Sequence, residues 1–266
     1  MPRSDAHGSF PGRLLAQART IGLDGLMVRA PRDRIGAVVG ALSAGTAIVE
    51  DERPLVVWLD ERGPLLSYAR AVRRAIPTTL GYRVGSIQGG AVQWEATDPR
   101  RYALAEQVAT ARLPAPEPGL DWNADPGPEG LGWPLRFGEP GSTGALSATN
   151  AGDAPTHPIV EFRGPVERPS LTKTGSGEVL EYDIALAGDD VLMVDTGAGT
   201  VTLNGTASRI DRASNRSVPE QTFTLAPGEL VGDVLAPTTT PLIFRAAPGS
   251  TDPAASATVR WRSAHW

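Results

Sequence analysis

Asp195-Thr196-Gly197 is the triplet in this sequence with the clearest chemical meaning, because aspartic proteases carry Asp-Thr-Gly after a run of apolar residues. Residues 191–194 supply such a run. That chemistry needs two carboxylates close enough to share one proton, and the sequence contains no second Asp-Thr-Gly or Asp-Ser-Gly. Asp, Thr and Gly are also ordinary turn residues between strands. The triplet therefore predicts a hairpin turn and not a protease.

A second group of carboxylates lies in and just after a segment with strand-like alternation. Its members are Glu178, Glu181, Asp183, Asp189 and Asp190. Such a group could supply the two carboxylates of a glycosidase or the oxygen ligands of a calcium ion. On a strand, Glu181 and Asp183 share one face, and the apolar residues between them need the other face for the core. We therefore expect a solvated strand face without a catalytic or metal-binding role.

The histidines and glycine clusters do not add a site. His7, His157 and His265 lie far apart without metal-type spacing, and we expect each at the surface. The glycine-rich residues 85–90 and 197–199 lack the Lys-Ser/Thr pair of a phosphate loop and do not open a helix, so both predict turns. The sequence thus nominates no catalytic, cofactor-binding or metal-binding residue, and it predicts a protein that is not an enzyme.

Composition limits the remaining classes. The 266 residues include 30 glycines and 24 prolines with only 6% aromatics, which is typical of a turn-rich β protein. Cysteine is absent, which excludes disulfides, thiolate nucleophiles and cysteine-ligated metals. A net charge of −5 argues against specific nucleic-acid binding. No apolar run is long enough to span a bilayer, and the first residues lack the apolar centre of a signal peptide, so we expect no membrane insertion or conventional secretion.

Residues 1–112 predict an N-terminal β-rich domain with one packed helix. The helix is expected between an N-cap at Asp33 and a C-cap at Gly45, because apolar residues recur at i, i+3, i+4 and i+7 from Ile35. A bulge or bend is expected at Gly25 in the first strand. The expected strands are residues 20–28, 54–59, 65–76 and 91–97.

Residues 113–158 are so rich in Pro and Gly that we expect no regular structure there. The segment also contains Trp122, Trp133 and Phe137, and a pure linker rarely includes so many aromatic residues. We therefore predict an ordered connector draped over the following domain.

Residues 159–266 predict a C-terminal antiparallel β-sandwich. Val201 and Leu203 should point into its core, and Asn204-Gly205 should form a tight turn. Short alternating segments bounded by Gly, Pro, Asn or Asp fit this architecture. The expected strands are residues 159–163, 178–186, 191–195, 200–203, 221–225, 241–245 and 257–261.

The tryptophans leave one binding alternative. Trp122, Trp133, Trp261 and Trp266, where solvent-facing, could stack on sugar rings as in a lectin. A carbohydrate-binding module of a host-recognition protein is therefore the alternative function, although core packing or a protein interface explains the same residues.

An ordered series of segments resembles the C-terminal domain of siphovirus distal tail proteins, also known as minor tail proteins. The series consists of residues 149–155, 159–166, 178–186, 190–195, 199–205, 223–228 and 257–261. Upstream, Ala96-Thr97-Asp98-Pro99-Arg100-Arg101-Tyr102 looks like the sequence that ends the first domain of this family. The resemblance covers most of the chain and rests on the order of the segments rather than on one motif.

The resemblance implies a structural protein of the virion tail tip, made in the host cytoplasm. The first domain of the family assembles into a homo-oligomeric ring, commonly a hexamer, that joins the tail tube to the hub protein. The second, galectin-like domain points outward and holds receptor-binding or tail fibre proteins. Family members usually carry further strands before the segment that matches residues 12–28, so we expect that the first sheet is shortened here, or that a neighbouring subunit or another tail protein completes its edge.

Overall fold

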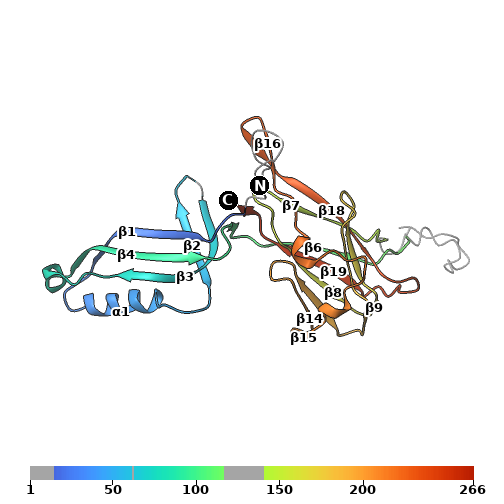
Figure 1. The fold of residues 1–266 in the computed structure, drawn as a ribbon, viewed down its shortest axis with the longest axis horizontal. Coiled ribbons are helices and arrows are strands. Elements are labelled where there is room, and N and C mark those ends of the chain that lie inside the picture. Colours follow the sequence, from blue (N-terminus) through green and yellow to red (C-terminus); the bar gives the residue numbers. More distant parts are fainter. Residues whose placement is uncertain (1–14, 62, 117–140) are drawn as a thin grey trace, which may run out of the picture. The chain divides into compact units, whose positions relative to one another are not determined.

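The protein is described by a computed structural model that covers residues 15–61, 63–116 and 141–266. The chain divides into two compact units, one formed by Met1–Tyr102 with Trp266 and the other by Ala103–His265 (Figure 1). Antiparallel strands make up most of the described secondary structure in both units, which confirms the predicted mainly β class.

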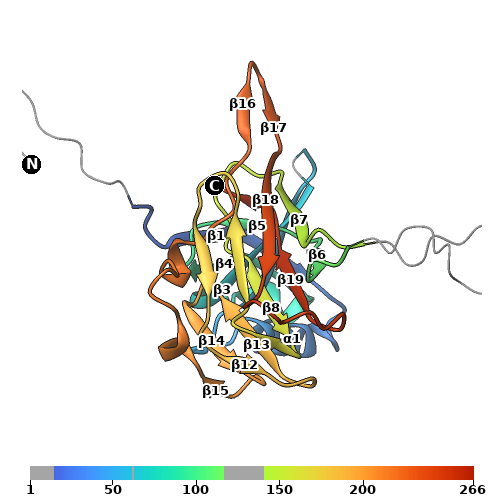
Figure 2. The same cartoon turned by 90° about the vertical axis from the view of Figure 1, so that its right-hand side faces the viewer.

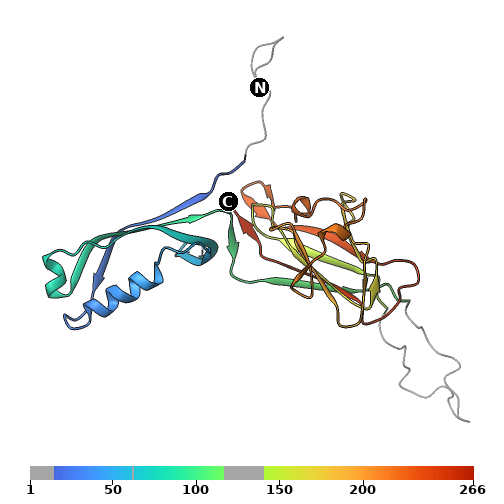
Figure 3. The same ribbon diagram turned by 60° about the horizontal axis from the view of Figure 1, so that its bottom comes forward.

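The first unit is an antiparallel sheet accompanied by one helix. Its strands follow the order β1-β4-β3, with β2 on the first half of β3 and β5 next to β3. Figure 3 shows the helix running along one face of this sheet. The elements are β1 (Arg19–Arg29), α1 (Ile35–Gly45), β2 (Arg53–Leu59), β3 (Gly63–Ala75), the 3-10 helix η1 (Leu80–Val84), β4 (Ser86–Ala96) and β5 (Arg101–Ala103).

Glycines shape β1 and β4 in different ways. The register of β1 against β4 shifts between Asp24 and Leu26, and Gly25 between them has φ of 72°, so the predicted bulge at Gly25 is confirmed. The predicted turn at residues 85–90 is only partly right. Gly85 ends η1 in the left-handed region, but β4 begins at Ser86 and includes the two glycines that follow.

Helix α1 begins and ends close to the predicted positions but is capped differently. Its N-cap is Arg34, not Asp33, and no side chain caps that end. At the other end, Arg74 of β3 donates from Nη1 to the carbonyl oxygens of Ser43, at 2.5 Å, and Thr46, at 3.2 Å. A cation on the last carbonyls is favourable because it neutralises the negative end of the helix dipole. Arg74 therefore ties the helix to the sheet.

The second unit is the predicted β-sandwich. One sheet has the order β11-β10-β18-β7 and the other β15-β14-β13-β8-β19-β6, with β9–β12 and β16–β17 as separate two-stranded antiparallel pairs. The elements are β6 (Gln107–Arg112), β7 (Ala145–Asn150), β8 (Ile159–Arg163), β9 (Val166–Glu167), β10 (Ser170–Lys173), β11 (Val179–Glu181), β12 (Ala185–Leu186), β13 (Val191–Asp195), β14 (Thr200–Leu203), β15 (Ala207–Ser208), η3 (Ile210–Arg212), η4 (Glu220–Thr222), β16 (Glu229–Val231), β17 (Val234–Ala236), β18 (Thr238–Arg245), β19 (Ser256–Trp261) and β20 (Ala264–His265).

One continuous apolar core joins the two sheets of this unit. Phe162 of β8 and Phe244 of β18 are fully buried, and their ring centroids lie 5.9 Å apart across the sandwich. Tyr182 adds a third buried ring, 6.2 Å from Phe162. Val201 is also buried, and Leu203 packs partly against the core, as the alternation of β14 predicts.

Three expected elements of the second unit differ from the structure. Residues 178–186 are not one strand, because β11 ends at Glu181 and β12 begins at Ala185. Residues 221–225 are not a strand either: η4 occupies the first of them, and Leu225 makes only an isolated bridge to Thr156. The stretch expected to lack regular structure contains β7, which pairs with β18.

Candidate assembly surfaces

Two strand edges of the first unit are open. Among the described residues, β1 pairs only with β4, and β2 pairs only with β3. An open edge presents unpaired N–H and C=O groups, which makes it a template for a strand of another chain. With 11 residues in β1 and 7 in β2, both edges are long enough to accept such a strand.

Strand β2 is apolar on both faces. Val56, Val57, Trp58 and Leu59 are 49%, 36%, 72% and 55% exposed, and successive residues of a strand point to opposite faces. A strand that is apolar on both sides is normally buried on both sides. Here one edge and much of both faces of β2 are left to solvent, so β2 has the composition of an interior strand in an exposed position.

Exposed apolar side chains are concentrated in the first unit. Thirteen of the nineteen large hydrophobic side chains that are exposed in the described structure belong to it, although it is the smaller unit. Contiguous exposed apolar surface usually marks an interaction site. The thirteen are Leu15, Leu23, Met27, Ile48, Val56, Val57, Trp58, Leu59, Tyr68, Val72, Leu80, Val84 and Trp266.

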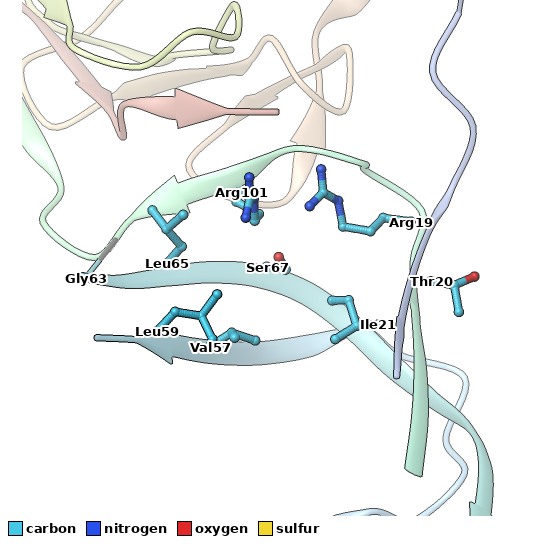
Figure 4. Close-up of a pocket in the computed structure, with 9 residues that line it drawn as sticks. All are labelled: Arg19, Thr20, Ile21, Val57, Leu59, Gly63, Leu65, Ser67 and Arg101. Carbon is cyan, nitrogen blue, oxygen red and sulfur yellow. The ribbon is translucent and has the colours of Figure 1, made fainter. Parts of the chain in front are cut away.

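A cavity of about 230 Å³ lies within the first unit, between β1, β2, β3 and β5. Figure 4 shows Val57 and Leu59 on one side of it, with the guanidinium groups of Arg19 and Arg101 across from them. Leu65 and the buried Ser67 of β3 also line the cavity. The cavity therefore combines an apolar wall with two cationic groups.

The β16–β17 hairpin of the second unit exposes apolar side chains and extends beyond the sandwich strands in Figure 2. Leu230, Val231 and Val234 are 74%, 66% and 69% exposed. The hairpin forms its own two-stranded sheet, and such a sheet is marginally stable alone. In the sequence, Gly232-Asp233 between two apolar pairs indicates this two-residue hairpin turn, although the hairpin was not among the predicted elements.

Asp98, Arg100 and Tyr102 form a polar cluster in the segment that looks like the end of the family's first domain. The Asp98 carboxylate accepts hydrogen bonds from Arg100 Nε at 2.8 Å and from the Tyr102 hydroxyl at 2.5 Å. Burial alone would raise the pKa of Asp98, but these hydrogen bonds outweigh it and hold the pKa below its usual value. Burial and the Asp98 charge both raise the pKa of Tyr102. The cluster fixes the chain where the first unit ends.

Asp195 occupies the predicted turn. Its Oδ1 accepts the main-chain N–H groups of Gly197 and Ala198, both at 2.9 Å, and the buried Thr196 hydroxyl donates to the carbonyl of Pro158 at 2.7 Å. These bonds make the triplet the loop between β13 and β14. The turn prediction for Asp195-Thr196-Gly197 is confirmed.

The prediction that the Glu181 side chain faces solvent is wrong. Its side chain is buried, because the strand ends there and Glu181 turns towards Ser214, which donates to Oε1 at 2.8 Å. Asp183 is exposed and pairs with Arg168 at 2.5 Å. Hydrogen bonds from Asn204 and from the main chain of Ala187 lower the pKa of Asp190.

The other carboxylates of this group also lie in local structure. Glu178 accepts from Lys173 Nζ at 2.7 Å, and this bond is the largest of the effects that lower the pKa of Glu178. Asp189 is exposed in a turn. The structure therefore brings Glu181 and Asp183 to different environments and not to a common site.

The remaining candidate residues are spread over the chain. His157 is half-buried, and His265 lies 3.7 Å from Asp153. Trp261 is buried and donates its indole N–H to the carbonyl of Thr149 at 2.9 Å, so it offers no surface to a sugar, whereas Trp266 is 44% exposed. His7, Trp122, Trp133 and Phe137 lie outside the described residues. Within the described ranges, no three His, Asp or Glu side chains gather as metal ligands.

These features define a class of two-unit β protein with open strand edges and exposed apolar surface. No helix in the described part of the chain is long and apolar enough to cross a membrane. Residues 151–245 match the family of the siphovirus-type tail component, C-terminal domain. No curated protein matches the sequence.

The fold is similar to a known phage protein structure over nearly the whole chain. The crystal structure of the Dit protein of phage SPP1, described as a paradigm of the hub adsorption apparatus in phages that infect Gram-positive bacteria, matches with a TM-score of 0.57 at 11% identity, over 99% of this chain and 86% of that one. The activated baseplate of phage P2 with calcium matches with a TM-score of 0.45 at 12% identity, over 92% and 85%. The family match over residues 151–245 and the similarity of the fold to the Dit protein confirm the resemblance to siphovirus distal tail proteins.

Proposed function

We propose that this protein is the distal tail protein of its phage and forms a closed ring that joins the tail tube to the baseplate hub. The observation that carries the proposal is the concentration of exposed apolar side chains in the first unit. That unit buries only seven hydrophobic residues among those described, three of them alanines. Its apolar surface therefore exceeds its core, which favours an obligate subunit.

Ring closure accounts for the two open edges. In a head-to-tail ring, one surface of each copy contacts a different surface of the next, so every β1 edge and every β2 edge finds a partner. Obligate interfaces of this kind typically bury about 2,000–5,000 Å² and are strongly apolar. The exposed faces of β2 have the required character. By resemblance to the family, the ring contains six copies.

The second unit serves as the outward domain in this proposal. It has a complete core of its own, and only six of its large hydrophobic side chains are exposed among the described residues, so it needs no partner to be stable. A rigid sandwich of this kind is suited to hold a receptor-binding or fibre protein. No observation in the described residues favours the carbohydrate-binding alternative, and the burial of Trp261 removes one of its candidate residues.

The mass of the assembly in solution tests the ring. Native mass spectrometry should give a single multiple of the 27.9 kDa chain, six if the copy number follows the family. Trp58→Glu should shift the protein towards monomer, because it places a charge in the apolar surface of β2. Ile210→Glu is the matched control, since Ile210 is 50% exposed in the second unit. A monomeric wild-type protein at micromolar concentration would refute the ring.

The position in the virion needs a separate test. Electron microscopy of particles that carry a label on this chain should place the label at the end of the tail tube, next to the baseplate. A label along the tube, or on the capsid, would contradict the proposed joint between tube and hub.

A further inference from the structure

The cavity between β1, β2, β3 and β5 is sized for protein side chains. Its volume of about 230 Å³ is below the roughly 300–1,000 Å³ of pockets that hold drug-sized molecules. Val57, Leu59 and Leu65 give it an apolar wall that is open to solvent. An apolar segment of a protein partner fits this volume better than a free metabolite does.

The cationic groups of the cavity specify the charge of that segment. The Nε atom of Arg19 is buried and makes no hydrogen bond within the described structure. Arg101 donates from Nη2 to the main-chain oxygen of Trp266. Asp60 and Glu61, in the turn after Leu59, do not line the cavity. A carboxylate next to an apolar side chain could pair with the guanidinium group of Arg19.

The β16–β17 hairpin has the complementary chemistry. Its tip joins Val231 to Val234 through Gly232-Asp233, and Glu229 begins its first strand. Val231 and Val234 lie opposite each other and are exposed together with Asp233. The hairpin therefore presents an apolar pair beside a carboxylate, and it contains no basic residue.

We propose that the β16–β17 hairpin of one copy docks at the β2–β3 cavity of a neighbouring copy, with the Asp233 carboxylate facing Arg19. The inference rests on the proposed ring, because each copy contributes one hairpin and one cavity, and a closed head-to-tail ring satisfies all of them. This one-to-one match favours a second copy of the chain over a different tail protein. The contact would stabilise a hairpin that is marginal alone and cover the apolar wall of β2.

Cross-linking in the assembled protein tests the contact. Because the chain contains no cysteine, only the introduced cysteines can react with the cross-linker. A variant with Leu59→Cys and Val234→Cys, treated with a short bismaleimide, should give a ladder of covalent oligomers on a denaturing gel. Both positions are exposed, at 55% and 69%, so the substitutions should not disturb folding. The control pairs Leu59→Cys with Ile210→Cys, which is 50% exposed but away from the hairpin, and should give no ladder.

Charge reversal tests the assigned pair. Asp233→Arg alone and Arg19→Glu alone should each reduce the yield of cross-linked oligomer several-fold in the double-cysteine background. The combination of both reversals should restore most of that yield, because the two charges are exchanged and remain opposite. If either substitution acted only by disturbing the fold, the second substitution would not restore the yield of cross-linked oligomer.

The outcomes separate this inference from the proposed ring. If native mass shows the ring but the double-cysteine variant gives no ladder, the hairpin contact is wrong and the ring stands. A cross-link confined to single chains would also overturn the inference, because it would show that the hairpin packs on its own copy. If no ring forms, both proposals fail.

Discussion

Phe162 offers the most direct test of the proposed independence of the two units. The side chain is fully buried between the sheets of the sandwich, with ring centroids 5.9 Å from Phe244 and 6.2 Å from Tyr182. Phe162→Ala removes the ring without adding a polar group. The perturbation therefore acts on packing in the second unit alone.

The expected loss in the free energy of unfolding follows from the packing around Phe162. Replacing a buried Phe by Ala typically lowers the free energy of unfolding by about 3–5 kcal/mol. The loss of two aromatic pairs places Phe162 at the upper end of this range, at about 4–5 kcal/mol. For a unit of this size, each 1 kcal/mol lowers the midpoint temperature by about 2–4 °C, so the shift should be about 8–20 °C. Phe162→Leu should cause a smaller shift in the same direction.

Differential scanning calorimetry of the full chain is the appropriate assay, because it resolves the transitions of separate units. Phe162→Ala should lower the sandwich transition and leave the other one in place. Ile210→Ala is the control: its side chain is 50% exposed in the second unit, so it should shift neither transition by more than a degree or two. Equal shifts of both transitions would refute the reasoning, since they would show that the units unfold as one.

Three further substitutions test the local structure. Gly152→Ala should lower the free energy of unfolding by at least about 3 kcal/mol in urea titration, because its Cβ would lie 1.7 Å from the carbonyl oxygen of Ala264; Gly175→Ala, with no atom within 4 Å, should be neutral. Asp98→Asn should lower the free energy of unfolding more at pH 7 than at pH 3. The lowered pKa of Asp98 gives stability that is full above its unfolded pKa of about 3.9 and is lost as the pH falls through the folded value, so an equal loss at both pH values would contradict this. Asp195→Asn should leave native mass unchanged and cost less than about 1 kcal/mol, since the amide oxygen still accepts from the turn; loss of a proteolytic activity on this change would refute the turn assignment.

Local sequence patterns were sufficient to predict those segments whose structure depends on their own residues. The helix starting at Ile35, the bulge at Gly25 and the turn at Asp195 were predicted because spacing, a positive φ and turn hydrogen bonds depend on near neighbours in the chain. The strand over β3 was predicted because the short turn before it favours an antiparallel return.

The alternation of apolar and polar residues gave a wrong prediction where a residue distant in sequence binds the side chain. Glu181 was predicted to face solvent because its neighbours are apolar, but Ser214, distant in sequence, supplies a hydrogen bond that makes its burial favourable. The expected strand at residues 221–225 was wrong for a related reason, since its buried residues Phe223 and Leu225 reach the core from a 3-10 turn and a single bridge.

The sequence by itself determined the β class, the sandwich and the absence of a recognisable catalytic motif, because these depend on periodicity, composition and turn residues. Only the tertiary structure determined which apolar residues stay exposed to solvent. Val57 and Val201 have the same side chain, yet one is 36% exposed at an open edge and the other is 1% exposed in the core. Periodicity specifies which residues share a face, but burial depends on what covers that face, and this is set by strand order in three dimensions.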